Sequence, residues 1–327
     1  MAKIQDKNLG YSFLKPIVRL ALRLFYRRIQ VVGKENIPKD KRIIYAPNHQ
    51  NALMDALMIL YIQPGSTVFL ARADIFKKKL IAAILTFLRI LPVYRIRDGR
   101  DELDKNYEIF EKSVDVLRDD IPLCLMPEGR QSFKRKLLPL VKGMFRIAFQ
   151  AQSELPDKDI VIVPIGIDYS NYTRPYSDVV VQIGKAIDVR KYMETYQVQQ
   201  GKALLDLKNE VSAGISSLIQ DIQSTSHYED IYVLSKKEAP DYCNKQGWKR
   251  NPYNLLQARK AISTQLDLLD SEDKFPQNYP TKSLPSHEKK GDEFKSSIIF
   301  VIFLILLLLL GIAIITTAII YILNIKH

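Results

Sequence analysis

The sequence has few of the residues on which metal sites and disulfide frameworks depend. Its 327 residues include only two cysteines, Cys124 and Cys243, and four histidines. They form no Cys-x-x-Cys pair and no cysteine–histidine cluster, so neither a disulfide framework nor a zinc site is indicated. Cys124 lies inside an apolar run, residues 121–126, and is expected to be a buried strand residue. A catalytic domain facing the cytosol fits this cysteine usage.

Several sequence signatures of known enzyme classes are also absent. The chain has no internal repeat, no Walker loop and no Gly-x-Ser-x-Gly motif. The last absence argues against a nucleophile-elbow serine. His227, His287 and His327 stand away from any candidate partner in the sequence, and we interpret them as surface residues.

The overall composition indicates a folded protein with anionic partners. Hydrophobic residues make up 47% of the chain, which is enough for a core. The 48 lysines and arginines outnumber the 36 acidic residues and give a net charge of +12. This charge favours phosphates, phospholipid headgroups or nucleic acid, and by itself does not choose among them.

The C-terminal segment favours lipid over nucleic acid. Residues 298–323 are 26 consecutive residues without a charge, long enough to cross about 30 Å of hydrocarbon. We therefore expect a transmembrane helix over residues 298–323, separated from the rest of the chain by a linker over residues 271–297. A re-entrant hairpin that bends at Gly311 is the alternative.

Charged residues beside this segment predict its orientation. Lys289, Lys290 and Lys295 precede it, whereas only Lys326 and His327 follow it. Because cytoplasmic flanks of membrane spans are enriched in lysine and arginine, we expect the large N-terminal domain to face the cytoplasm. The expected location is a membrane, the bacterial inner membrane in the first instance.

The first 30 residues contain a second membrane signal. Basic residues recur at every fourth position: Lys15, Arg19, Arg23 and Arg27. Apolar residues fill the rest of the helical wheel. We interpret residues 1–30 as an amphipathic helix at the membrane interface. The alternative is a helix docked on the protein with its basic face in water.

Between these ends, β-rich runs alternate with helical stretches, which predicts an α/β domain over residues 31–200. The candidate strands are residues 42–46, 67–71, 121–126, 160–167 and 179–183. The candidate helices are residues 53–62, 77–88, 102–118 and 141–152. Two further amphipathic stretches, residues 202–223 and 252–269, predict a helical extension over residues 201–270.

Two polar segments each follow a candidate strand, where ligands bind in open α/β sheets. The first is Asn-His-Gln-Asn-Ala-Leu-Met-Asp at residues 48–55, and the second is Pro-Glu-Gly-Arg-Gln-Ser at residues 127–132. A histidine with a nearby carboxylate can be held in one tautomer and take a proton from a hydroxyl group, which makes His49 and Asp55 a candidate pair. Arg130 offers a planar fork suited to phosphate.

In their order, these segments resemble the motifs of the glycerolipid acyltransferase superfamily, whose bacterial archetype is 1-acylglycerol-3-phosphate acyltransferase. Residues 48–55 resemble the Asn-His-x4-Asp block, and residues 127–132 resemble Pro-Glu-Gly-Thr-Arg-Ser. Leu-Pro-Val-Tyr-Arg at residues 91–95 resembles the second block, and residues 162–167 resemble the apolar, proline-containing fourth block. The resemblance covers about residues 40–170 and implies a sheet flanked by helices.

The sequence departs from the family pattern in two places. Five residues, 50–54, separate the histidine from the aspartate, where the family usually has four. Relatives that acylate glycerol 3-phosphate or dihydroxyacetone phosphate can carry the longer spacing. In the third block, Arg130 stands one place early. The basic residues that follow it, Lys134, Arg135 and Lys136, could share the phosphate with Arg130.

The resemblance implies a membrane-bound O-acyltransferase that transfers a fatty acyl group from acyl-CoA or acyl-carrier protein to lysophosphatidate, giving phosphatidate. His49 would be the base, and Asp55 would orient it. The residues implied to bind substrate are Asn48, Arg95, Glu128, Gly129, Arg130 and Ser132. No metal, nucleic acid or cofactor beyond the acyl donor is implied.

Three alternatives remain open at this point. The acceptor could be glycerol 3-phosphate, dihydroxyacetone phosphate or another lysolipid. A lipid hydrolase would use His49 to activate water instead of an acceptor. A protein that binds membranes without catalysis is the third alternative.

Overall fold

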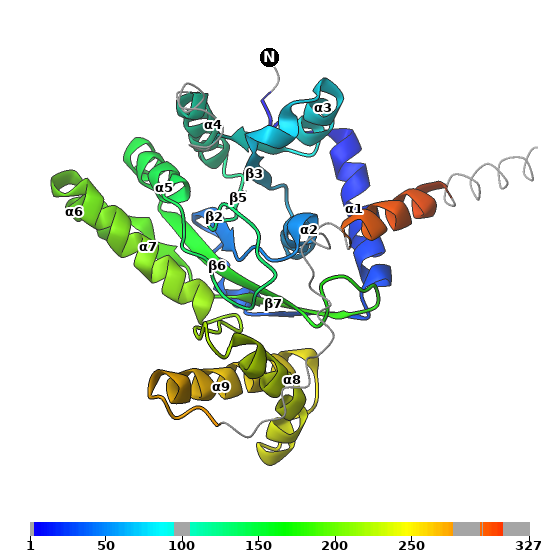
Figure 1. The fold of residues 1–327 in the computed structure, drawn as a ribbon. Coiled ribbons are helices and arrows are strands. Elements are labelled where there is room, and N and C mark those ends of the chain that lie inside the picture. The colour runs from blue at the N-terminus through cyan, green and yellow to red at the C-terminus, as the bar shows by residue number, and fades with distance from the viewer. Residues whose placement is uncertain (1–2, 95–104, 277–294, 296, 310–327) are drawn as a thin grey trace, which may run out of the picture.

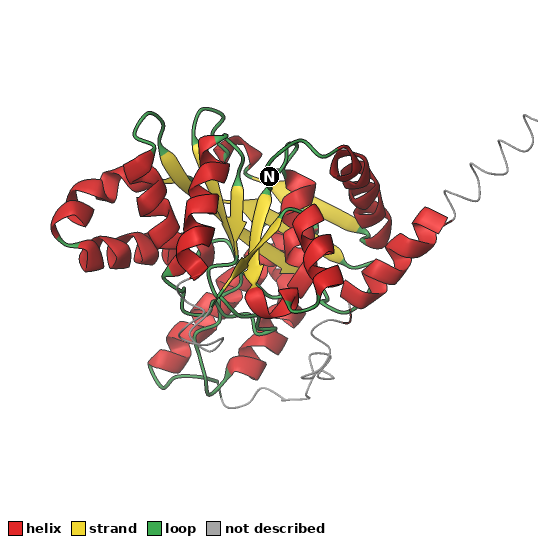
Figure 2. Cartoon of the chain, turned by 90° about the horizontal axis from the view of Figure 1, so that it is seen from above, coloured by secondary structure: helices red, strands yellow, loops and turns green. Residues whose placement is uncertain are grey.

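A mixed sheet with helices on both faces forms the centre of the computed structural model, which describes residues 3–94, 105–276, 295 and 297–309 (Figures 1 and 2). The prediction of an α/β fold with a sheet flanked by helices is confirmed. Arg95, most of the predicted linker and residues 310–323 of the predicted membrane span lie outside the described residues.

The described sheet has the strand order β1-β7-β6-β2-β5-β3-β4, and β8 pairs with β6. Neighbours are parallel, except that β6 is antiparallel to β7 and β8. The strands are β1 (Arg28–Val32), β2 (Arg42–Pro47), β3 (Val68–Arg72), β4 (Ile90–Val93), β5 (Leu123–Leu125), β6 (Ile160–Tyr169), β7 (Asp178–Ile183) and β8 (Ile187–Asp188). Every predicted strand is found. In addition, β1 begins inside the segment assigned to the N-terminal helix, so the α/β domain starts at Arg28.

The four helices predicted inside the α/β domain are found, whereas α6 was not predicted and the helices beyond the domain differ from the prediction. They are α1 (Leu9–Phe25), α2 (Ala52–Ile62), α3 (Lys79–Phe87), α4 (Lys105–Arg118), α5 (Gly143–Glu154), α6 (Met193–Val198), α7 (Gln200–Ser216), α8 (Tyr228–Lys245) and α9 (Pro252–Ser271), and residues 297–309 are also helical. The helix predicted over residues 202–223 ends at Ser216. The helix α8 was not predicted, and Pro240 lies inside it.

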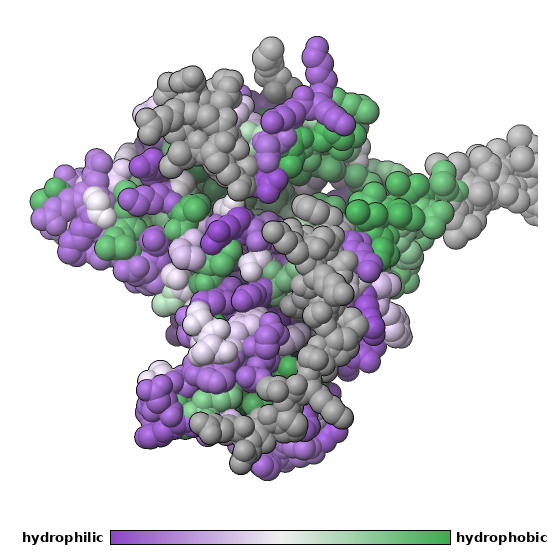
Figure 3. All heavy atoms as spheres, viewed as in Figure 1, coloured by the Kyte–Doolittle hydropathy of each residue, from purple (hydrophilic) through white to green (hydrophobic). Residues whose placement is uncertain are grey.

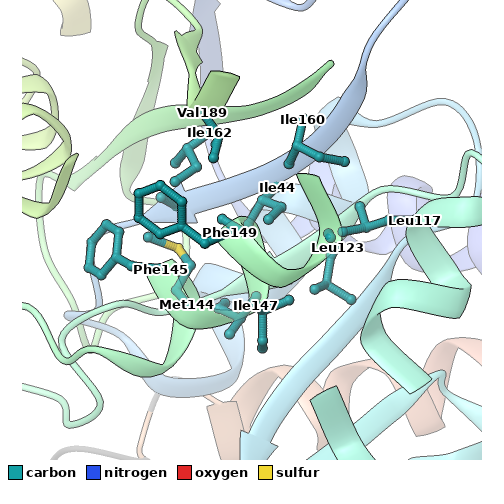
Figure 4. Close-up of a cluster of buried hydrophobic side chains, with 14 of the residues drawn as sticks. Ile44, Leu117, Leu123, Met144, Phe145, Ile147, Phe149, Ile160, Ile162 and Val189 are labelled. Carbon is teal, nitrogen blue, oxygen red and sulfur yellow. The ribbon is translucent and has the colours of Figure 1, made fainter. Parts of the chain in front are cut away.

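Alternating side chains of the strands build one apolar core on each face of the sheet. On β2, Ile44 and Ala46 join the core that α4, α5 and α7 cover, and Figure 4 shows part of this core. Ile43 and Tyr45 point to the other face, which α1 and α2 cover. Because β2 is buried on both faces, it is apolar along its whole length apart from Arg42.

The C-terminal part of the chain divides differently from the prediction. Helix α7 contributes Leu207 and Val211 to the core of the α/β domain, so it belongs to that domain. Helices α8 and α9 pack on each other around a smaller cluster that includes Ile222, Ile231 and Ile262. They lie side by side below the sheet in Figure 1. We call residues 217–271 the helical extension.

Helix α1 is docked on the protein by the residues that were predicted to form a basic stripe. The ammonium group of Lys15 is buried and donates hydrogen bonds to the carbonyl oxygens of Gln63, Pro64 and Gly65, which follow α2. Arg23 donates to the hydroxyl of Tyr61. The interpretation of Lys15 as part of a surface stripe is therefore wrong, because carbonyl groups at the end of a helix attract a cation.

Within residues 3–94, 105–276 and 297–309, no helix combines the length and apolar character that a membrane crossing requires. The described part of the predicted span, residues 298–309, packs against α1 (Figure 1). The rings of Phe300 and Phe25 meet edge to face, with centroids 5.3 Å apart.

Candidate active site

The two polar segments of the sequence come together at one edge of the sheet. The first follows β2 and the second follows β5, and these strands are parallel neighbours with Ile44 opposite Leu123 and Tyr45 opposite Cys124. The carboxyl ends of both strands therefore lie at the same edge, as the sequence predicted. Cys124 is fully buried, as expected for a strand residue.

His49 and Asp55 form a hydrogen-bonded pair at this edge. The Nδ1 atom of His49 lies 3.0 Å from Oδ2 of Asp55. The His49 side chain is 22% exposed, whereas that of Asp55 is 1% exposed. A carboxylate at Nδ1 favours the tautomer that leaves the lone pair on Nε2, and within the described residues Nε2 makes no hydrogen bond. The imidazole can therefore accept a proton at Nε2.

The Asp55 carboxylate is held by the start of α2 as well as by the histidine. Its Oδ2 atom accepts hydrogen bonds from the backbone N–H groups of Gln50 and Asn51, at 2.9 and 2.8 Å. Its Oδ1 atom accepts from the hydroxyl of Tyr169, at 2.9 Å. Backbone N–H groups at a helix start favour a negative charge, so this environment keeps the carboxylate fixed.

The longer spacing between His49 and Asp55 is accommodated at the first residue of α2. Ala52 has a φ angle of 42°, in the left-handed region that residues with a side chain seldom adopt. With this turn before α2, the carboxylate of Asp55 lies within hydrogen-bonding distance of His49. The extra residue therefore does not separate the pair.

Asn48, predicted to bind substrate, is a buried residue that bonds the protein backbone. Its side chain is 1% exposed and bonds the backbone of Ile167 in both directions, donating from Nδ2 and accepting at Oδ1. Both amide atoms thus serve to fix the chain on β6. We interpret Asn48 as a residue that positions His49, because its side chain is turned away from the surface.

Glu128 is a buried carboxylate that joins three segments of the site. Its Oε1 atom accepts from the backbone N–H of His49, at 2.6 Å, and its Oε2 atom accepts from that of Leu138, at 2.9 Å. Burial raises the pKa of Glu128 to about 7, although both N–H groups and His49 act to lower it. Its role is to hold the turn and the histidine together.

The raised pKa of Glu128 predicts a pH-dependent contribution to stability. The contribution is present below the ordinary glutamate pKa of 4.5 and is lost as the pH rises to about 7, since burial penalises the ionised form. We expect the unfolding free energy of Glu128→Gln, relative to wild type, to improve by roughly 2–3 kcal/mol between pH 4 and pH 8. Urea unfolding across this range measures it. Parallel pH dependences in the two proteins would show that Glu128 does not titrate this way.

The turn after Glu128 presents Arg130 to solvent. Gly129 has a φ angle of 62°, and a Cβ atom there would lie 3.1 Å from a methyl carbon of Val141, so the position suits glycine. Arg130 is exposed and makes no hydrogen bond or ion pair among the residues described. Ser132 donates its backbone N–H to the carbonyl of His49, at 3.2 Å. Arg130 therefore lies on the segment that adjoins the histidine and is available to an anion.

The three basic residues that follow have different environments. Arg135 is 1% exposed and pairs with Asp168, so the prediction that it could share a phosphate with Arg130 is wrong. Lys136 donates to the carbonyl of Gln223, at 2.7 Å. Lys134 is exposed, with its ammonium 4.8 Å from the ring centre of Tyr228. Of these three residues, only Lys134 is exposed as a residue that shares a phosphate with Arg130 must be.

Several residues of the site were not predicted from the sequence. The hydroxyl of Tyr169 reaches Asp55 from the end of β6, and that of Tyr172 donates to the side chain of Gln50, at 2.7 Å. The available signal for both tyrosines was a polar side chain at the end of β6 or just after it. His227, expected at the surface without a partner, bonds Asp270 and stacks on Phe275.

The arrangement supplies acid–base chemistry and anion binding. A histidine with one free ring nitrogen lies beside a fixed carboxylate, and an exposed arginine lies on the adjacent turn. In the described part of the chain, no three His, Cys, Asp or Glu side chains are placed to hold a metal ion.

Comparison with known proteins agrees with this geometry. Residues 28–168 match the family model described as Acyltransferase. The chain resembles the glycerolipid acyltransferases. The matched segment begins with β1 and ends at Asp168 on β6, so it contains the His49–Asp55 pair and the turn at Glu128. The predicted likeness to 1-acylglycerol-3-phosphate acyltransferase is confirmed over this part of the chain.

Individual relatives are similar over the same part of the chain. The 1-acyl-sn-glycerol-3-phosphate acyltransferase of Limnanthes alba is 28% identical over 150 residues, 46% of this chain and 50% of that protein. The human 1-acyl-sn-glycerol-3-phosphate acyltransferase alpha is 24% identical over 163 residues, 50% of this chain and 53% of that protein. The chain thus spans about half the length of these curated relatives.

A solved structure is also similar. The crystal structure of the 1-acyl-sn-glycerophosphate (LPA) acyltransferase from Thermotoga maritima aligns with a TM-score of 0.44 and 20% sequence identity. The alignment covers 65% of this chain and 83% of that one.

Proposed function

We propose that this protein transfers a fatty acyl group from a thioester, acyl-CoA or acyl-carrier protein, to the free hydroxyl of lysophosphatidate, which gives phosphatidate. The observation that carries the proposal is the His49–Asp55 pair with a free Nε2, beside a turn that exposes an arginine. The family likeness of residues 28–168 and the names of the relatives support the same reaction.

The pair would act on the acceptor directly. Nε2 of His49 takes the hydroxyl proton while the hydroxyl oxygen attacks the thioester carbonyl carbon. The tetrahedral intermediate then collapses, the carbon–sulfur bond breaks, and the proton on His49 passes to the leaving thiolate. Asp55 stabilises the imidazolium between these two steps. Atoms and charge balance without a covalent acyl-enzyme.

The acceptor phosphate would be bound by arginine. Arg130 is exposed and unpaired among the described residues, and it follows the Glu128–Gly129 turn that bonds the backbone of His49. Charge-assisted hydrogen bonds from a guanidinium suit a phosphate. Arg95, which lies outside the described residues, remains a second candidate on the family resemblance. Lys134 is the third, as it is exposed on the same loop.

An acceptor panel tests the substrate assignment. Purified protein with palmitoyl-CoA would be given lysophosphatidate, glycerol 3-phosphate, dihydroxyacetone phosphate or lysophosphatidylcholine in turn. We expect the largest kcat/KM for lysophosphatidate. A larger kcat/KM for glycerol 3-phosphate would identify it as the acceptor instead of lysophosphatidate. The proposed transfer of an acyl group from a thioester to a hydroxyl would be unchanged.

We also propose that the protein binds a membrane through three neighbouring apolar surfaces. Exposed apolar side chains lie on α1 (Leu9, Phe13, Leu20 and Leu24), on α3 (Leu80, Ile81, Ile84 and Phe87) and on residues 297–309 (Ile298, Ile302, Ile305, Leu306 and Leu309). In Figure 3 the hydrophobic atoms gather over α3 and residues 297–309. A Cβ atom on Gly10 of α1 would lie 3.1 Å from the Phe87 ring, so α1 and α3 are adjacent. Exposed apolar side chains on adjacent elements are typical of membrane contact.

The membrane proposal predicts a large effect of single charges on this surface. A protein that ends at residue 290 keeps α1 and α3, and Phe13→Asp or Leu80→Asp should weaken its binding to vesicles of phosphatidylglycerol and phosphatidylcholine by about tenfold or more. Both side chains are 73% exposed, so the folded state should tolerate the change. Vesicle co-sedimentation measures the effect, and Leu268→Asp on α9 is the control. Equal binding by all three variants would remove α1 and α3 from the membrane interface.

A further inference from the structure

One loop of the candidate site is bonded to the histidine segment at two residues, Ser132 and Lys134. We call residues 129–141 the motif loop. The backbone N–H of Ser132 donates to the carbonyl of His49, at 3.2 Å. The side-chain amide of Gln50 donates to the carbonyl of Lys134, at 3.0 Å. A shift of the motif loop therefore moves hydrogen-bond partners of His49 and of its neighbour.

The opposite side of the motif loop is bonded to the helical extension. The backbone N–H of Arg135 donates to the hydroxyl of Tyr228 on α8, at 2.6 Å, and its carbonyl accepts from the N–H of Ile222, at 2.7 Å. The N–H of Leu137 donates to a carboxylate oxygen of Asp221, at 2.9 Å. These contacts leave the central residues of the motif loop between the histidine segment and the extension.

A buried cluster of charged side chains also connects the motif loop to the helical extension. Asp168, the last residue of the family match, accepts from Arg135 of the motif loop and from Arg259 of α9. All three side chains are at least nine-tenths buried. Burial raises the pKa of Asp168, but the charges of Arg135 and Arg259 outweigh it and hold that pKa below its usual value. The Arg135 guanidinium also lies 4.4 Å from the ring centre of Tyr172.

We propose that Tyr228 and Arg259 of the helical extension are positioning residues for acyl transfer, because they fix the motif loop on which the proposed phosphate ligand Arg130 and the contacts to His49 depend. The inference rests on the proposed function for its kinetic consequence. The extension lies beyond residues 28–168, which match the family model. A segment outside the family match therefore holds the motif loop of the candidate site.

The kinetic experiment compares two tyrosines on one helix. Tyr228→Phe removes the hydroxyl that accepts from the buried backbone N–H of Arg135, so this hydrogen bond is lost. We expect kcat/KM for lysophosphatidate to fall by about 5- to 100-fold, mainly through the acceptor KM, with the acyl-CoA KM changed less than about twofold. Tyr232→Phe is the control, since its hydroxyl makes no hydrogen bond within the described residues.

A second pair of variants tests the charge cluster. Arg259→Gln removes the charge that faces Asp168, whereas Arg259→Lys retains it. The proposal requires a raised acceptor KM in Arg259→Gln and partial recovery in Arg259→Lys. A purely structural role would instead lower the unfolding temperature of the variants and leave the acceptor KM of the folded fraction unchanged, which would overturn the proposal.

Hydrogen exchange provides a readout that does not depend on the reaction. In full-length wild-type protein in detergent, we expect slow amide exchange across the motif loop. Exchange should become faster there in Tyr228→Phe and remain unchanged in Tyr232→Phe. Equal protection of the motif loop in all three proteins would overturn the positioning role. A wild-type protein without acyl transfer would contradict the proposed function, and the exchange result would still decide the present inference.

Discussion

Replacement of His49 with alanine should reduce acyl transfer by about 10²–10⁴-fold, the range that a positioned acid–base group contributes. The reason is that the acceptor hydroxyl is a weak nucleophile until Nε2 takes its proton. The side chain of His49 is partly exposed and makes its one hydrogen bond in the described residues to Asp55, so its removal should leave the fold intact. The rate of phosphatidate formation at saturating substrates measures the effect.

Asp55→Asn is a second test of the same pair. An amide can still accept at one oxygen, but it has no charge to stabilise the imidazolium and can favour the wrong tautomer. We expect a strong loss of kcat with a small change in KM. His287→Ala, remote in sequence from both motifs, is the matched control. Near-wild-type turnover in both His49→Ala and Asp55→Asn would show that the catalytic pair is misassigned.

The largest expected effect on stability comes from Asp168→Asn. This change removes the carboxylate that pairs with both Arg135 and Arg259, and it leaves the two buried guanidinium groups without that negative charge. Removal of one partner from a buried ionic cluster typically costs about 3–5 kcal/mol, because the remaining charge is neither solvated nor paired. Urea unfolding of the purified protein measures the change in free energy.

An exposed ion pair provides the comparison for Asp168. Asp115 pairs with Arg118 on α4, and both side chains are more than a third exposed. Asp115→Asn should therefore cost about 0–1 kcal/mol. If the two variants lose the same small amount of stability, the cluster at Asp168 does not hold the motif loop to the helical extension.

The sequence was sufficient to predict the five central strands of the sheet and its polar edge, whereas β1, β4 and β8 were not predicted. Strands such as β6 are apolar along most of their length because they are buried on both faces, and that pattern is visible without a structure. The turn at Glu128 and the segment at His49 each follow such a strand, and the parallel pairing of β2 with β5 brings them together. Local patterns and family order thus account for the centre of the site.

The remainder depends on contacts that no local pattern encodes. Lys15 has helical spacing with the other basic residues, yet it is buried because α2 ends beside it with carbonyl groups that accept its hydrogen bonds. Arg135 lies between two lysines, which suggests a surface loop. Its partner Asp168 is on β6 and is shared with Arg259 of α9, so the pairing is visible only in the folded protein. Helix α8 was not predicted, and Pro240 interrupts the helical pattern of its sequence. Packing against α9 stabilises the helix in the folded protein.

The most direct test of the proposed reaction is to measure thioester loss and phosphatidate formation together. Purified full-length protein in detergent would be given palmitoyl-CoA with and without lysophosphatidate. The proposed mechanism predicts that free CoA appears only when the acceptor is present, in a one-to-one ratio with phosphatidate. It also predicts that His49→Ala lowers both signals by about 10²–10⁴-fold. Release of CoA and free fatty acid at the same rate without the acceptor would identify water as the nucleophile and contradict acyl transfer.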